Sequence, residues 1–203
     1  MKVTHNDISD DDLEQLFNLI YSQTKRIGDL LKRFNPIVSS RGKESSFVIY
    51  DRIKLIFEDL HARLESACIR YTIDGNKYIR IYGDAIHFDQ VFYNLVVNSI
   101  YAINHAHKQS GTIKVDINYN DNNDVIISFC DDGSGIPEGV ADKIFEPFFS
   151  TREPTSDEGG KGLGLFIVWN ILKMFNGHIF LDKQYIKGTK FNIFIPKQEE
   201  QNE

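Results

Sequence analysis

The sequence predicts an α+β fold of two layers, in which helices cover one face of a mixed β-sheet. Helical and strand patterns alternate irregularly along the 203 residues, without the strict rhythm of a doubly wound fold. Apolar residues make up 41% of the chain, which is enough for a sizeable core. The net charge of -6 argues against non-specific nucleic-acid binding, because no basic excess is available to neutralise phosphates.

The two cysteines and the hydropathy pattern bear on the compartment. Cys68 and Cys130 lie far apart without metal-type spacing, so we expect free thiols in a reducing environment. The chain shows no signal-peptide pattern and no apolar run near the roughly 18 residues of a membrane span. We therefore expect a cytoplasmic protein, or the cytoplasmic piece of a larger sensor, with no membrane segment in this chain.

The N-terminal third predicts a flexible segment at residues 1–12 and a helix within residues 13–40. Asn35-Pro36 ends this helix, because proline disfavours helical geometry in the residue before it. Apolar residues recur at seven-residue intervals, as in a coiled-coil seam: Leu13, Ile20, Ile27 and Phe34. The seam either folds back on its own domain or, as we favour, pairs with other helices.

The middle of the chain predicts a second amphipathic helix at residues 50–67. Alternating apolar and polar residues at 68–73 and 78–82 predict two strands, paired through the turn-like Asp74-Gly75-Asn76. Gly83-Asp84 begins a long helix that extends to about residue 107.

The rest of the chain predicts two hairpins and two helices, followed by a disordered tail at residues 198–203. The turn-forming residues 120–123 join the first strand pair. The elements are strands at 112–119 and 125–130, a short helix at 141–145, a helix at 162–175, and strands at 178–182 and 189–195.

Residues 129–168 contain glycine-punctuated turns that suggest a ligand cradle. Asp131 opens an Asp-x-Gly-x-Gly turn, and a Gly-x-Gly-Leu-Gly-Leu run at 160–165 leads into the predicted helix. Glycine lets the backbone approach a ligand closely, and N–H groups at a helix N-terminus attract anions. Each motif alone is weak, since such turns are often ordinary loops. Their order and spacing predict a site for a phosphorylated ligand, with Asp131 reading a polar group.

This set, with the asparagine-bearing segment 90–99 and Phe-Glu-Pro-Phe at 145–148, resembles the ATP-binding domain of the GHKL superfamily. That superfamily comprises sensor histidine kinases, type II topoisomerases, 90-kDa heat-shock chaperones and MutL proteins. The sequence is most similar to the catalytic domain of nitrogen-sensor-like histidine kinases of two-component systems. The resemblance implies a Bergerat-type α/β sandwich at residues 46–197. Residues 13–40 resemble the second helix of a dimerisation hairpin.

The resemblance implies ATP and Mg²⁺ as cofactors. Asp131 would accept a hydrogen bond from the adenine amino group and reject guanine. Asn98 would hold Mg²⁺ through its side-chain oxygen, and Asn94 would be a second ligand or position water, so both are the catalytic candidates. Residues 150–158 would form a lid. Besides Asn98 and Asp131, the implied nucleotide-binding residues are Ala102, Gly133, Gly135, Ile136, Phe149, Gly160, Lys161, Gly162, Leu163, Gly164, Leu165 and Thr189.

Two positions depart from patterns within the superfamily. Its hydrolases have a glutamate where this chain has Asn94, and asparagine cannot take a proton from water. Slow or absent hydrolysis is therefore expected, with the γ-phosphoryl group kept for transfer. Many relatives have a lysine at the position of Tyr101, so Lys161 and Arg152 are the candidates for the missing phosphate contact.

The function implied is an ATP-dependent protein-histidine kinase that relays phosphoryl groups to a response-regulator receiver domain. We expect a homodimer through the N-terminal helix. The acceptor helix has no counterpart, since His5 lacks the helix and proline that normally follow. Either the chain is truncated, or it phosphorylates in trans or only senses ATP. The alternatives are a non-catalytic ATP-binding interaction module and a serine or protein kinase of the anti-sigma or mitochondrial type, against which the dimerisation-like helix argues.

Overall fold

The computed structural model of the protein describes residues 43–106, 109–152 and 162–198. The predicted flexible segment 1–12, the predicted helix within 13–40 and residues 199–203 of the predicted tail lie outside these ranges. In the described part, no helix is long and apolar enough to cross a membrane.

One layer is a five-stranded mixed sheet with the order β2-β4-β5-β7-β6. β2 runs parallel to β4, and the other neighbours are antiparallel. Alternate residues of β5 and β7 are buried, so one face of the sheet packs against the helical layer. The strands are β2 (Ile69–Gly75), β4 (Gly111–Tyr119), β5 (Val125–Asp131), β6 (His178–Leu181) and β7 (Thr189–Ile195).

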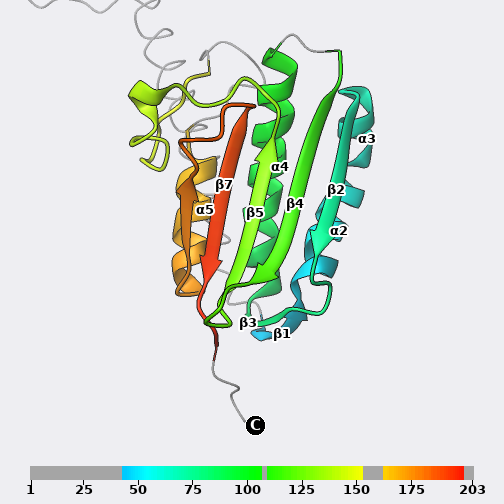
Figure 1. Ribbon diagram of the computed structural model, residues 1–203, viewed down its shortest axis with the longest axis vertical. Coiled ribbons are helices and arrows are strands. Elements are labelled where there is room, and N and C mark those ends of the chain that lie inside the picture. The colour runs from blue at the N-terminus through cyan, green and yellow to red at the C-terminus, as the bar shows by residue number, and fades with distance from the viewer. Residues whose placement is uncertain (1–42, 107–108, 153–161, 199–203) are drawn as a thin grey trace, which may run out of the picture. The chain divides into compact units, whose positions relative to one another are not determined.

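The helices form the second layer, behind the sheet in the view of Figure 1. They are α2 (Ile49–Asp59), α3 (His61–Ser66), α4 (Ala85–His105) and α5 (Gly164–Met174). The predicted helix at residues 50–67 is divided at Leu60 into α2 and α3. Fully buried aromatic rings, including Phe88, Phe92 and Phe129, fill the space between the layers. The predicted α+β fold is therefore confirmed.

The predicted hairpin of strands 68–73 and 78–82 is wrong. β3 (Arg80–Gly83) instead pairs antiparallel with β1 (Ser45–Val48), a strand that the sequence did not predict. The end of β2 is held against β4, where the Asn76 amide donates to the Ile117 carbonyl over 2.7 Å. Gly75, at φ +94°, lies so close to Ile117 that a Cβ would overlap its carbonyl oxygen. The turn-like residues thus end a parallel strand and do not close a hairpin.

The predicted short helix at residues 141–145 is also wrong. A 3₁₀ turn at Glu138–Val140 is followed by further turns. The Lys143 amide donates to Val140, and the Glu146 amide donates to Lys143, each three residues back. Pro147 follows at once and disfavours helical geometry in the residue before it. The other two predicted hairpins and the helix at 162–175 are confirmed, with α5 beginning at Gly164.

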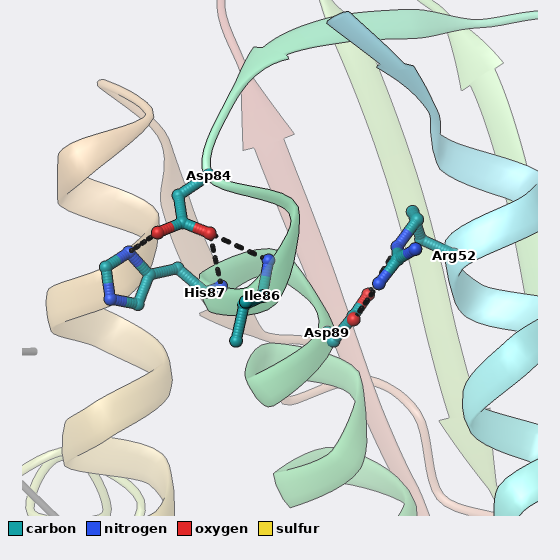
Figure 2. A network of polar contacts seen from close by, with 5 residues as sticks. All are labelled: Arg52, Asp84, Ile86, His87 and Asp89. Carbon is teal, nitrogen blue, oxygen red and sulfur yellow. Dashed lines mark hydrogen bonds and ion pairs between the residues drawn. The ribbon is translucent and has the colours of Figure 1, made fainter. Parts of the chain in front are cut away.

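A polar network holds the start of α4 (Figure 2). Asp84 caps the helix, since its Oδ1 accepts from the amides of Ile86 at 2.8 Å and His87 at 3.4 Å. Its other oxygen lies 3.3 Å from Nδ1 of His87. Arg52 of α2 pairs with Asp89 of α4, and its Nε donates to Oδ1 over 2.8 Å. Burial raises the pKa of the Asp89 carboxyl, and Arg52 partly offsets that rise.

Candidate functional site

A pocket opens between the C-terminal half of α4, the end of β5, the loop after β5 and the start of α5. Its lining includes the predicted nucleotide-binding residues Asn98, Ala102, Asp131, Gly135, Ile136, Phe149, Gly162, Gly164, Leu165 and Thr189. Three further lining residues, Ser150, Thr151 and Arg152, belong to the predicted lid, and Arg152 was also a candidate cation. Sequence reasoning did not assign the other lining residues to the site: Leu95, Ser99, Tyr101, Ser134, Pro137, Val140, Ile144 and Phe191.

The remaining predicted residues fall into two groups. Gly160 and Lys161, with most of the predicted lid, lie outside the described residues. Asn94, Gly133 and Leu163 are described but do not line the pocket. Leu163 is buried in the core. A Cβ on Gly133 would come within 2.7 Å of the carbonyl carbon of Ala102, so this glycine allows the loop to pack against α4.

Asp131 is a buried carboxylate at the end of β5. Its Oδ1 accepts from the backbone amides of Gly133 at 2.9 Å and Thr189 at 3.2 Å. Its Oδ2 accepts from the Ser99 hydroxyl at 2.6 Å. Burial raises the pKa of the Asp131 carboxyl, and these three hydrogen bonds partly offset that rise. The carboxylate is therefore held in one orientation at the wall of the pocket.

Ser99 is the functional residue that sequence reasoning missed most clearly. It is buried on α4, one residue after Asn98, and it reaches across to β5. A serine inside a helix carries no local signal of such a contact, because its partner is 32 residues away. Only the packing of α4 on the sheet shows that Ser99 orients Asp131.

The two predicted asparagines lie beside the first residue of α5. A Cβ on Gly164 would lie 3.3 Å from Oδ1 of Asn94 and 3.6 Å from Nδ2 of Asn98, so both amides pack close to this glycine. Nδ2 of Asn94 donates to the Gln90 carbonyl over 2.7 Å. The side-chain oxygen of Asn94 therefore points away from Gln90. The described residues contain no cluster of three or more His, Cys, Asp or Glu that could hold a metal.

These amide oxygens suit Mg²⁺, which takes oxygen ligands and keeps several waters. A divalent ion at this place would depend on one or two amide oxygens, on water and on oxygens of the ligand itself. The donor set therefore fits a metal that arrives with a phosphorylated ligand better than a metal held by the protein alone.

Arg152 brings a positive charge into the pocket. It donates from its guanidinium to Oδ1 of Asn98 over 2.7 Å. The guanidinium carbon lies 3.9 Å from the centre of the Tyr101 ring, which in turn stacks on His105 with ring centres 3.8 Å apart. Of the two candidate cations, Arg152 therefore lies at the pocket, and Lys161 is outside the described residues.

This arrangement offers a buried acceptor, apolar walls and a cation in one pocket. Ile136 and Ile144 contribute apolar surface, and the start of α5 contributes a helix N-terminus. Among the described residues lining the pocket, Asp131 is the only carboxylate, and three donors hold it. The described lining thus offers no second carboxylate that could serve as a general base for water.

Comparison with protein families and curated proteins is consistent with this geometry. Residues 83–199 match the family described as "Histidine kinase-, DNA gyrase B-, and HSP90-like ATPase". Sporulation kinase A of Bacillus subtilis (strain 168) is 30% identical over 191 residues, which cover 91% of this chain and 29% of that protein. Sensor kinase CckA of Brucella abortus (strain 2308) is 36% identical over 153 residues, covering 68% of this chain and 15% of that protein.

Solved structures show the same fold. The nucleotide-free catalytic domain of the histidine kinase ThkA is 28% identical, with a TM-score of 0.65 over 78% of this chain and 100% of that domain. A structure of ThkA in complex with the response regulator TrrA has a TM-score of 0.64 at 23% identity, covering 96% of this chain and 54% of that chain.

Proposed function

This chain belongs to the histidine kinase-, DNA gyrase B- and HSP90-like ATPase family, and we propose that its catalytic domain transfers the γ-phosphoryl group of ATP to a histidine. The chain spans less than a third of sporulation kinase A and of CckA. The acceptor histidine would therefore belong to another part of the full protein or to a partner.

The observation that carries this proposal is the held carboxylate of Asp131. A carboxylate can accept about four hydrogen bonds, and three protein donors engage Asp131. The remaining acceptor position suits the amino group of adenine, in a charge-assisted hydrogen bond worth about 1.5–3 kcal/mol. Guanine presents a carbonyl oxygen at that place, so two acceptors would meet and GTP should bind poorly.

Other residues in the pocket and beside it would bind the phosphates and the metal. The amides at the start of α5, near Gly162 and Gly164, suit an anion. Asn98, with Asn94 as a second ligand, would hold Mg²⁺, which when bound neutralises phosphate charge. Asn94 cannot take a proton from water, so these residues would bind and orient ATP while leaving the γ-phosphoryl group for an acceptor.

The domain organisation and partners form part of the same proposal. Residues 46–197 would be the catalytic domain, and residues 13–40 the second helix of a hairpin that pairs two copies of the protein. ThkA, whose catalytic domain resembles this one, is known in complex with a response regulator. A receiver domain that takes the phosphoryl group onto an aspartate would be the downstream partner, and the site of action would be the cytoplasm.

The first test is calorimetric titration of the chain with Mg-ATP and with Mg-GTP. We expect saturable binding of ATP, little binding of GTP, and a loss of about tenfold or more in ATP affinity in Asp131→Asn, because the adenine acceptor then carries no charge. Asp121→Asn, in an exposed turn, is the matched control and should bind as the wild type. Equal binding of GTP and ATP would contradict the adenine site.

The second test measures transfer of the γ-phosphoryl group from ATP to a histidine. The chain is mixed with ATP and a separately supplied helical hairpin that carries an acceptor histidine. We expect phosphohistidine on the hairpin and little free phosphate in its absence. Rapid phosphate release without an acceptor would contradict transfer. Tight ATP binding without transfer to any intact hairpin would point instead to a non-catalytic interaction module.

A further inference from the structure

The hydrogen bonds of Asp131 distinguish its two carboxylate oxygens. Oδ1 accepts from two backbone amides, those of Gly133 at 2.9 Å and Thr189 at 3.2 Å. Among the described residues, Oδ2 accepts from one donor, the Ser99 hydroxyl at 2.6 Å. A carboxylate oxygen has about two lone-pair sites, so both sites on Oδ1 are used and one site on Oδ2 is open. A ligand in the pocket therefore finds its acceptor at Oδ2.

Both amides that bind Oδ1 belong to segments packed closely on their neighbours. A Cβ on Gly188, the residue before Thr189, would overlap the carbonyl oxygen of Asp131. A Cβ on Gly133 would lie 2.7 Å from the carbonyl carbon of Ala102. Because a backbone amide can only donate, the atom at the Oδ1 position has to be an acceptor. The two ends of the side chain at position 131 are therefore not interchangeable.

Ser99 binds the other oxygen through a hydroxyl, and a hydroxyl can either donate or accept. Ser99 is 2% exposed, and both Ser99 and Asp131 line the pocket. An ionised carboxylate only accepts, so the Ser99 proton points at Oδ2. Ser99 thus occupies one lone pair of Oδ2 and leaves the other for a ligand. The position offered to the ligand is an acceptor, because the proton of Ser99 is already used.

We propose that Oδ2 of Asp131 is the atom that reads the 6-substituent of the purine, and that Ser99 is the positioning residue that directs the open lone pair of this atom toward the base. This inference rests on the proposed function, since it concerns selection of the nucleotide by the same site. The 6-amino group of adenine donates to Oδ2 beside the Ser99 hydroxyl. A 6-oxo purine places an acceptor there and is rejected.

The first experiment compares ATP with purine riboside triphosphate, which has a hydrogen in place of the 6-amino group, by calorimetry of the full chain with Mg²⁺. In Ser99→Ala, the carboxylate is held only through Oδ1, so Oδ2 can turn away from the base. ATP binding should weaken by about threefold to tenfold, the range of one hydrogen bond. Purine riboside triphosphate offers no donor to Oδ2, so its affinity should not change. A purely structural role of Ser99 would weaken the binding of both nucleotides equally.

Asp131→Asn tests the same assignment with inosine triphosphate (ITP), which carries a 6-oxo group and lacks the 2-amino group of guanine. The amides of Gly133 and Thr189 require an oxygen at the Oδ1 position, so the new amide nitrogen takes the position of Oδ2. There it donates one hydrogen to the Ser99 hydroxyl, which turns to accept, and the other to the base. The ratio of ITP affinity to ATP affinity should therefore rise by about tenfold or more.

The double variant and two controls complete the series. Adding Ser99→Ala to Asp131→Asn removes the acceptor for the new nitrogen, so the shift toward ITP should shrink by several-fold. Ser66→Ala removes an exposed hydroxyl at the end of α3, and Asp121→Asn changes an exposed turn. Both controls should bind all three nucleotides as the wild type does.

The outcomes separate this inference from the proposed function. Wild-type protein that does not bind ATP would overturn the proposed function and the inference with it. Wild-type protein that binds ATP, with Ser99→Ala unchanged or weakened equally for ATP and purine riboside triphosphate, would overturn the inference alone. An Asp131→Asn variant whose ITP-to-ATP ratio stays at the wild-type value would also overturn it. If Ser99→Ala fails to fold, this ratio in Asp131→Asn decides.

Discussion

Helix α4 carries polar side chains near both ends, and the two ends use them differently. At the N-terminal end, Asp84 accepts from amides of its own helix and contacts His87 (Figure 2). In the C-terminal half, Asn98 and Ser99 reach groups from distant segments around the pocket, including Asp131. The polar groups at the N-terminal end interact within the helix itself, whereas those in the C-terminal half form hydrogen bonds with segments that are distant in sequence.

The two sets of polar side chains therefore have different roles. Side chains that cap a helix N-terminus contribute to stability, because loss of the cap leaves backbone amides without a hydrogen-bond acceptor. Groups around the pocket are partly engaged and partly open to a ligand, so their substitution should change binding more than folding. Substitutions at each end of α4 therefore test whether stability and binding are divided in this way.

We expect the greatest loss of stability from Gly133→Ala, which is an exception to this division. Gly133 lies near the pocket end of α4, but its substitution should act on stability. In Gly133→Ala, the new Cβ would lie 2.7 Å from the Ala102 carbonyl carbon and 2.9 Å from the Ile103 nitrogen. Backbone atoms of a helix cannot yield cheaply, so we expect a loss of about 3 kcal/mol in the free energy of unfolding. Denaturant unfolding without nucleotide measures it.

The matched control for this substitution is Gly139→Ala, where an added Cβ would meet no atom within 4 Å. It should unfold at nearly the wild-type denaturant concentration. A Gly133→Ala variant as stable as Gly139→Ala would show that the loop does not depend on its close approach to α4.

Loss of the Asp84 cap at the N-terminal end of α4 should have a smaller effect on stability. Asp84→Ala removes the side-chain acceptor for the amides of Ile86 and His87. We expect a loss of about 1–2 kcal/mol in the free energy of unfolding, with ATP affinity unchanged in the folded protein. Asp84→Asn keeps a capping oxygen and should lose less. A large drop in ATP affinity with intact stability would contradict the division between the two ends.

We expect the weakest effect from pH, which should change the affinity of the pocket for adenosine through Asp131. Burial raises the pKa of Asp131, and the charged form is the proposed adenine acceptor. Adenosine affinity should therefore fall as pH falls through this raised pKa, by at most tenfold per pH unit. Calorimetry of adenosine binding over the acidic range measures the profile, and Asp121→Asn should share it. A constant affinity down to about pH 4, the ordinary range of an aspartate, would contradict a raised pKa.

The same shift has a defined sign for stability. The folded state holds the Asp131 proton more tightly than the unfolded state, so the contribution of Asp131 is fully present below the unfolded pKa. It is lost as pH rises through the folded pKa. Asp131→Asn should lack this trend, because its side chain does not titrate.

Much of the fold could be predicted from local patterns. The alternation in β4, β5 and β7 and the helical period of α4 and α5 are properties of neighbouring residues, so they predicted those elements. The pairing of β2 could not be predicted in this way. Its partner β4 lies beyond the whole of α4, and a strand's alternation does not encode which strand it will join.

The candidate site residues could be recognised from local sequence patterns. Asp131 lies at a strand end, Asn98 lies on a helix, and glycines precede α5, in an order that local chemistry makes recognisable. Their contacts with one another depend on how the chain folds. Folding brought Ser99 to Asp131, packed Gly133 on Ala102 and set Arg152 between Asn98 and Tyr101. These contacts could not be predicted from local patterns, because each joins segments about 30 or more residues apart and arises only when the helices pack on the sheet.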